Sequence, residues 1–101
     1  MNTTVITSVE AVVDAAREQE LLDGYRQMTA RAWPDGLLRA ELLRGREGRW
    51  RLQSTWRDMQ AILTLRASGV RPAALDLLES VGAKHEHAVF TVEQSYDGLP
   101  K

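Results

Sequence analysis

Two histidines near the end of the chain are the first residues that could carry chemistry. His85 and His87 are separated by one residue in KHEH, so on a β-strand they would share a face while Glu86 points the opposite way. Two imidazoles form part of many zinc sites, but a third ligand at helical or strand spacing is missing from this sequence. We therefore predict no metal site. His85 is the candidate for proton transfer near neutral pH, and a solvated strand end is the structural alternative.

Tyr25 is the second candidate catalytic residue. It recurs with Leu21 and Met28 at the spacing of an amphipathic helix, so its side chain is expected to point toward the core. A phenol lining an apolar pocket could hydrogen-bond a substrate enolate. The structural alternative is a core residue whose hydroxyl pairs with the backbone.

An alternating stretch, residues 50–56, supplies the candidates for substrate binding. Trp50, Leu52, Ser54 and Trp56 would share one face of a strand, the face expected beneath the helices. Trp56 would either close the core or form a flat wall for a planar substrate, with its indole N–H donating one orienting hydrogen bond. Ser54 lacks the surroundings of a nucleophilic serine. The predicted substrate-binding set is Trp56, Trp50, Leu42, Ser54 and Arg39.

Arginines are concentrated between residues 39 and 57. This stretch contains six arginines and only two acidic residues, Glu41 and Glu47. Arg39, Arg51 and Arg57 would project from the sheet face opposite the helices. They are expected to form salt bridges on a solvated or self-associating surface. The functional alternative is that one of them reaches an anionic substrate oxygen through a dimer interface.

Composition excludes several classes of function. The sequence contains no cysteine, which removes thiolate catalysis and cysteine metal sites and is compatible with a cytoplasmic location. A net charge of −1 argues against nucleic-acid binding. No apolar run is long enough for a membrane helix, and the first residues lack the pattern of a signal peptide. No phosphate-binding glycine loop or cofactor fingerprint is present, so we predict no cofactor.

The hydrophobic pattern predicts an α+β fold. The order of elements is strand, helix, strand, strand, helix pair, strand, which is the βαββαβ order of ferredoxin-like domains. Helices are expected on one face of a four-stranded antiparallel sheet. The whole chain, 1–101, is predicted to be one domain with a core at about 3–95 and a tail at 97–101. The strands are expected at 3–9, 36–45, 49–57 and 87–94, and the helices at about 21–32, 58–65 and 72–82.

Three stretches give the chain a family resemblance: VITSVEAVV, YRQMTARAWPDGLLRAELLRG and WRLQSTWRDMQAI. With VFTV as a closing strand, they resemble the antibiotic biosynthesis monooxygenase (ABM) superfamily over residues 4–92. The resemblance implies a homodimer, a dimeric α/β barrel in which two sheets pack face to face, and a small-molecule pocket between sheet and helices in each subunit. It also implies that Trp56, the tryptophan at the end of a strand, is a packing residue.

The activities of that superfamily set the functional hypotheses. Some members oxidise polycyclic phenols to quinones with oxygen and no cofactor, and others degrade haem. The first strand here has only Thr7 and Ser8 where the haem-degrading branch has asparagine, and residues 63–65 lack that branch's tryptophan. Haem degradation is therefore not expected. The leading hypothesis is a cofactor-independent monooxygenase acting on a small aromatic or polyketide-like molecule; a polyketide cyclase and a non-enzymatic dimeric binding domain stay open as alternatives.

Overall fold

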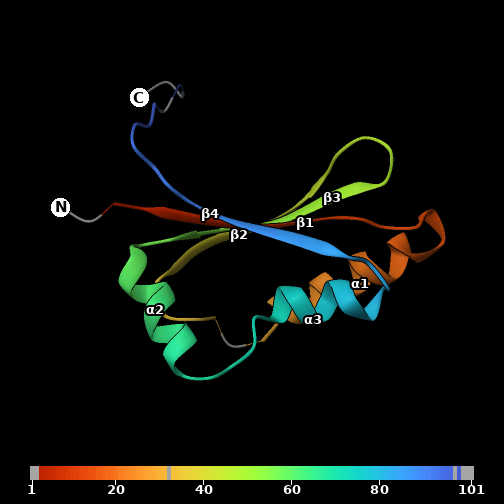
Figure 1. The fold of residues 1–101 in the computed structure, drawn as a ribbon, viewed down its shortest axis with the longest axis horizontal. Coiled ribbons are helices and arrows are strands. Elements are labelled where there is room, and N and C mark those ends of the chain that lie inside the picture. The colour runs from red at the N-terminus through yellow and green to blue at the C-terminus, as the bar shows by residue number, and fades with distance from the viewer. Residues whose placement is uncertain (1–2, 32, 97, 99–101) are drawn as a thin grey trace.

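The computed structural model describes residues 3–31, 33–96 and 98. Its four strands form one antiparallel sheet in the order β2-β3-β1-β4 (Figure 1). This is the ferredoxin-like α+β fold, as the element order predicted. The elements in chain order are β1 (Val5–Val12), the 3-10 turn η1 (Ala15–Arg17), α1 (Glu18–Thr29), β2 (Leu37–Arg44), β3 (Arg49–Trp56), α2 (Met59–Ala67), α3 (Ala73–Ser80) and β4 (His85–Thr91).

All three α-helices lie on the same side of the sheet, and within the described part of the chain the other side carries no helix (Figure 1). Within this layer α1 and α3 lie together, whereas α2 lies apart near the opposite end of the strands (Figure 1). The helix layer is therefore divided into two parts, and this division positions the candidate site.

Local sequence signals account for the ends of the elements. The carboxylate of Asp58 accepts a hydrogen bond of 2.9 Å from the backbone N–H of Ala61, so it caps α2 in the way that an aspartate before a helical stretch indicates. After α3 the chain turns at Gly82 with a φ of +73°, a conformation that glycine adopts without steric cost. Residues 45–48 join β2 to β3, as expected from their glycines.

Several element boundaries and the alternation of β2 differ from the sequence prediction. Strand β1 continues to Val12, and β4 begins at His85, two residues before the predicted start. A β-bulge between Leu37 and Arg39 interrupts the alternation of β2. Simple alternation along this strand predicts that Leu38 faces the helices together with Leu42. That prediction is wrong, because the bulge places Leu37 against the core and leaves Leu38 57% exposed.

The core consists of two clusters that follow the division of the helix layer. The larger cluster lies between the sheet and the α1–α3 pair and contains Leu21, Trp50, Leu52 and Leu78. The smaller cluster joins α2 to the sheet and consists of Val5, Trp56, Ala61 and Ile62. Sequence parity correctly predicted that Trp50 and Trp56 are buried beneath the helices. It also suggests that Trp56 packs with Leu42 and the Tyr25 stripe, whereas Trp56 packs against α2.

Two predicted features lie partly outside the described residues. Ala32, the last residue of the predicted helix at 21–32, is not described. Of the predicted tail at 97–101, only Gly98 is described. Within the described part of the chain, no helix combines the length and apolarity required to span a membrane.

Candidate functional site

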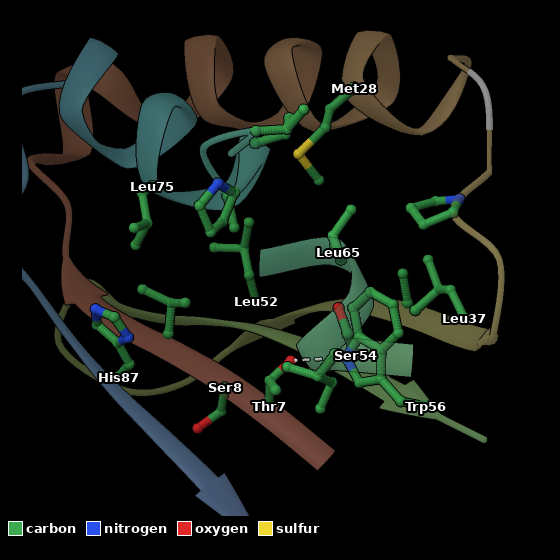
Figure 2. Close-up of a pocket in the computed structure, with 18 of the residues that line it drawn as sticks. Thr7, Ser8, Met28, Leu37, Leu52, Ser54, Trp56, Leu65, Leu75 and His87 are labelled. Atoms are coloured by element: carbon green, nitrogen blue, oxygen red, sulfur yellow. Dashed lines mark hydrogen bonds between the residues drawn. The ribbon is translucent and has the colours of Figure 1, made fainter. Parts of the chain in front are cut away.

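A pocket of about 630 Å³ lies where the helix layer divides. Its walls come from both core clusters and from the sheet between them (Figure 2). Residues that follow α1 and α2 complete the walls, namely Arg31, Trp33, Pro34, Gly69, Val70 and Pro72. A volume of this size lies within the range of about 300–1,000 Å³ found for small-molecule sites. The lining residues are Thr7, Ser8, Val9, Met28, Thr29, Arg31, Trp33, Pro34, Leu37, Ala40, Leu52, Ser54, Trp56, Ile62, Leu65, Arg66, Gly69, Val70, Pro72, Ala73, Ala74, Leu75, His87, Ala88 and Val89.

The sheet forms the floor of this pocket. Thr7 on the central strand β1 pairs with Ser54 of β3 on one side and with Val89 of β4 on the other. One step along the sheet, Val9 lies between Leu52 and His87 in the same way. Paired residues in antiparallel strands point to the same face, so the floor presents two hydroxyls and one imidazole among apolar side chains.

Trp56 forms one wall of the pocket and is fixed by a hydrogen bond. Its indole Nε1 donates to the hydroxyl of Thr7 at 3.0 Å, across the two strands (Figure 2). The side chain is 7% exposed and packs on α2. Trp56 is thus a core residue whose indole also borders the pocket, and its N–H has a protein partner rather than a free position for a ligand.

The structure brings only two of the predicted site residues, Ser54 and Trp56, into the lining of the pocket. Trp50 and Leu42 belong to the α1–α3 cluster instead. The N–H of Trp50 donates to Glu18 at 3.1 Å, and the Arg44 guanidinium lies 4.3 Å from the centre of its ring. Both polar and aromatic groups of Trp50 are therefore used in packing.

Arg39 lies on the far side of the sheet from the pocket. Its register partner is Thr55, whose side chain points away from the helices, and it forms a 3.6 Å ion pair with Glu41. Arg51 pairs with Glu10 at 3.2 Å on the same face. These contacts are the salt bridges expected from the sequence.

Tyr25 packs against the α1–α3 cluster and does not line the pocket. Its hydroxyl oxygen is buried and has no hydrogen-bond partner among the described residues, so the expected backbone partner is not there. Burial raises the pKa of the Tyr25 phenol, and the charge of Glu41 raises it further.

His85 is held at the edge of the helix layer, beside the pocket. Its Nε2 lies 3.3 Å from the carboxylate of Glu79, which also pairs with Arg71. The hydrogen bond from His85 and, to a smaller extent, the charge of Arg71 lower the pKa of Glu79. The rings of His85 and His87 are 5.9 Å apart between centroids, and His87 is the member of the pair that lines the pocket.

Sequence reasoning did not select Thr7 or His87 as site residues. Alternation along β1 places Thr7 on the inward face with Val5 and Val9, so parity was a usable signal for it. His87 shares a face with His85, and only the tertiary arrangement shows which of the two reaches the pocket. Among the residues that the structure describes, no group of three histidine or acidic side chains is placed to hold a metal ion.

Comparisons with known proteins agree with this architecture. No family model matches the sequence, and no curated protein matches it. Among solved structures, a mutant of SnoaB from Streptomyces nogalater, described as a cofactor-independent oxygenase, is 24% identical, with 97% of this chain and 98% of that chain covered and a TM-score of 0.69. A proposed antibiotic biosynthesis monooxygenase from Deinococcus radiodurans is 19% identical, with coverage of 95% and 99% and a TM-score of 0.66.

The chain shares its ferredoxin-like α+β fold with these two proteins. A haem-degrading protein from Mycobacterium tuberculosis is similar to the same degree, at 23% identity, 97% and 100% coverage and a TM-score of 0.70. Because this fold is shared by an oxygenase and a haem-degrading protein, the fold alone does not select the activity. The residues that line the pocket are therefore needed to distinguish between the possible activities.

Proposed function

We propose that this protein binds a small aromatic or polyketide-like molecule in the pocket and oxidises it with molecular oxygen, without a bound cofactor. The observation that carries the proposal is the pocket itself: about 630 Å³, with mostly apolar lining residues and an indole wall. A flat, apolar ligand could stack against Trp56 while Thr7, Ser54 and His87 lie within the floor. The similarity to SnoaB supports oxygenation as the reaction.

The proposed chemistry is assisted by the substrate. An activated C–H group of a phenolic ring system loses its proton, and the resulting carbanion transfers an electron to oxygen. Recombination gives a hydroperoxide anion, which takes up a proton and loses water to leave a carbonyl group. Overall a CH₂ group and O₂ become a C=O group and water, so no external reductant is needed.

In this scheme His87 takes the proton, because its imidazole lines the pocket and histidine commonly transfers protons near neutral pH. Trp56 holds the ring system, and the hydroxyl of Ser54 stabilises the developing oxyanion. The catalytic roles expected from the sequence, a hydrogen bond from Tyr25 to a substrate enolate and proton transfer by His85, stay predictions. Both side chains lie outside the lining, where His85 could act only through His87.

A non-enzymatic binding domain is the second candidate. Its support is the hydrogen bond between Trp56 and Thr7, in which the indole N–H is already used by the protein. A pocket with few free polar groups would bind an apolar ligand well and would have little means to activate it.

Self-association through the helix-free face of the sheet also belongs to the proposal. Phe90 and Leu43 are 55% and 37% exposed, and both have register partners that lie on this face, Ile6 and Arg51 respectively. Apolar side chains interspersed with paired arginines and glutamates suit a surface that packs against a copy of itself about a two-fold axis.

Oxygen consumption with a hydroxylated anthrone tests the proposed activity. We expect protein-dependent uptake of oxygen above the spontaneous rate and formation of the corresponding quinone, measured by its absorbance. His87→Ala should slow this reaction about 100-fold or more if the imidazole is the base. His85→Ala is the matched control on the same strand and should retain most of the rate.

Other results would redirect the proposal. Binding of the anthrone without oxygen uptake would favour the binding domain, and conversion of a polyketide chain without oxygen would favour a cyclase. A rate that falls in Tyr25→Phe or His85→Ala but not in His87→Ala would show that His87 is not the base. It would instead support Tyr25 or His85, the catalytic residues predicted from the sequence.

A further inference from the structure

The charges that line the pocket are all of one sign. Arg31 and Arg66 line it together with His87, and no aspartate or glutamate is among the lining residues that the structure describes. The chain as a whole has 14 acidic and 13 basic residues, so this asymmetry is not a consequence of composition. A cleft bordered by one sign of charge concentrates the opposite charge in a ligand.

Both arginines belong to the mouth of the pocket. Arg66 lies in the last turn of α2, and Arg31 follows the end of α1. Both arginine side chains are exposed, whereas the side chains of Trp56 and Leu52 are buried in the same pocket. A ligand could therefore keep a charged group at the surface and an apolar body inside.

Helix dipoles offer a simpler reason for these arginines, because cations are favoured near helix C-termini. Two observations go beyond that explanation. Arg26 also lies in the last turn of α1, but it does not line the pocket. An arginine at a helix end therefore need not line the pocket. In addition, Arg31 and Arg66 are available to a ligand, because neither forms an ion pair with a carboxylate among the described residues. Arg26, Arg46 and Arg49 are likewise without such a pair, but they do not line the pocket.

We infer that the ligand of this pocket is an anion: an aromatic or polycyclic body bearing a carboxylate, which Arg31 and Arg66 hold at the mouth while the rings lie against Trp56. Guanidinium and carboxylate groups are matched in shape as well as in charge. The inference rests on the proposed function and narrows its substrate class. It also assigns the anion contact to the pocket mouth rather than to Arg39, which lies on the other side of the sheet.

The test compares two fluorescent ligands with the same three-ring body, 9-anthracenecarboxylate and the neutral 9-anthracenemethanol. Each is titrated into the full-length protein at low and high salt. The variants are Arg31→Gln/Arg66→Gln and a control, Arg46→Gln/Arg49→Gln, which removes two hairpin arginines that do not line the pocket. Both double variants lower the positive charge by the same amount, so a general effect of net charge appears in both.

We expect the wild-type protein to bind the carboxylate more tightly than the alcohol. Two partly exposed charge pairs should give a preference of about threefold to tenfold at low salt, and salt should reduce it. Arg31→Gln/Arg66→Gln should abolish this preference with little change in affinity for the alcohol, whereas the hairpin control should retain it.

Two results would overturn the inference, and they can be told apart. Equal binding of both ligands by the wild-type protein, or a preference that survives Arg31→Gln/Arg66→Gln, would leave an apolar binding pocket without selection for anions. Binding of neither ligand would remove the proposed binding function together with the inference.

Discussion

The buried hydroxyl of Tyr25 leads to a prediction about stability. Its oxygen has no partner among the described residues, so folding removes it from water without a compensating hydrogen bond. Leaving a buried polar group unpaired costs about 1–3 kcal/mol. Tyr25→Phe removes the hydroxyl and keeps the ring that packs against the α1–α3 cluster. After a small loss of packing contacts, we expect the variant to be more stable by about 1 kcal/mol.

Urea unfolding followed by tryptophan fluorescence measures this difference. With a slope of about 2 kcal/mol per M, the midpoint should rise by about 0.5 M. The control is Tyr96→Phe, because Tyr96 is 92% exposed and its hydroxyl loses no solvation on folding. All variants must be compared at one protein concentration, since self-association would couple stability to concentration. A midpoint that falls by 0.5 M or so in Tyr25→Phe would show that the hydroxyl has a favourable partner and would refute the reasoning.

The same burial predicts how Tyr25 titrates. Burial and the nearby Glu41 raise the pKa of the phenol above its ordinary value of about 10. A raised pKa in the folded state means that the fold favours the neutral phenol. This contribution to stability is complete below about pH 10 and is lost as the pH rises through the raised pKa. Absorbance at alkaline pH should show a phenol transition above the ordinary range for tyrosine, and Tyr25→Phe should remove it.

Three further variants test other parts of the structure. Asp58→Ala removes the side-chain cap of α2 and should lower the free energy of unfolding by about 1 kcal/mol, measured in urea. Trp56→Phe removes the donor to Thr7 and part of the pocket wall, so it should cost about 1–3 kcal/mol of stability and weaken binding of a three-ring ligand. Replacing Arg39 and Arg51 with glutamate should lower the mass measured by analytical ultracentrifugation; an unchanged mass would count against the helix-free face as the interface.

Much of the fold is predictable because local chemistry and global architecture agree. Alternating residues define β1 and β3, the carboxylate of Asp58 starts α2, and Gly82 ends the helix pair. Topology then follows from the order of elements. The failure at Leu38 has a physical cause, because a β-bulge adds one residue to β2 and reverses the parity before it.

The candidate site was less predictable because it depends on distances between elements rather than on patterns within them. Parity placed Ser54 and Trp56 on the inward face, and both line the pocket. The same parity placed Trp50 on that face, but Trp50 lies beneath the α1–α3 pair, where its ring is covered. No periodicity in the sequence distinguishes an inward residue beneath a helix from an inward residue beneath a gap.

That gap follows from how tightly the helices can approach one another. Gly24 of α1 faces Leu77 of α3 so closely that a Cβ atom at residue 24 would lie 2.4 Å from the leucine Cδ1. The absent side chain lets α1 and α3 pack as a pair over one half of the sheet, with Leu21 and Leu78 fully buried between them. Helix α2 is anchored separately through Ala61 and Ile62. A fold of this kind obtains its stability from two small cores, and the space between those cores is where a ligand can bind without disrupting either one.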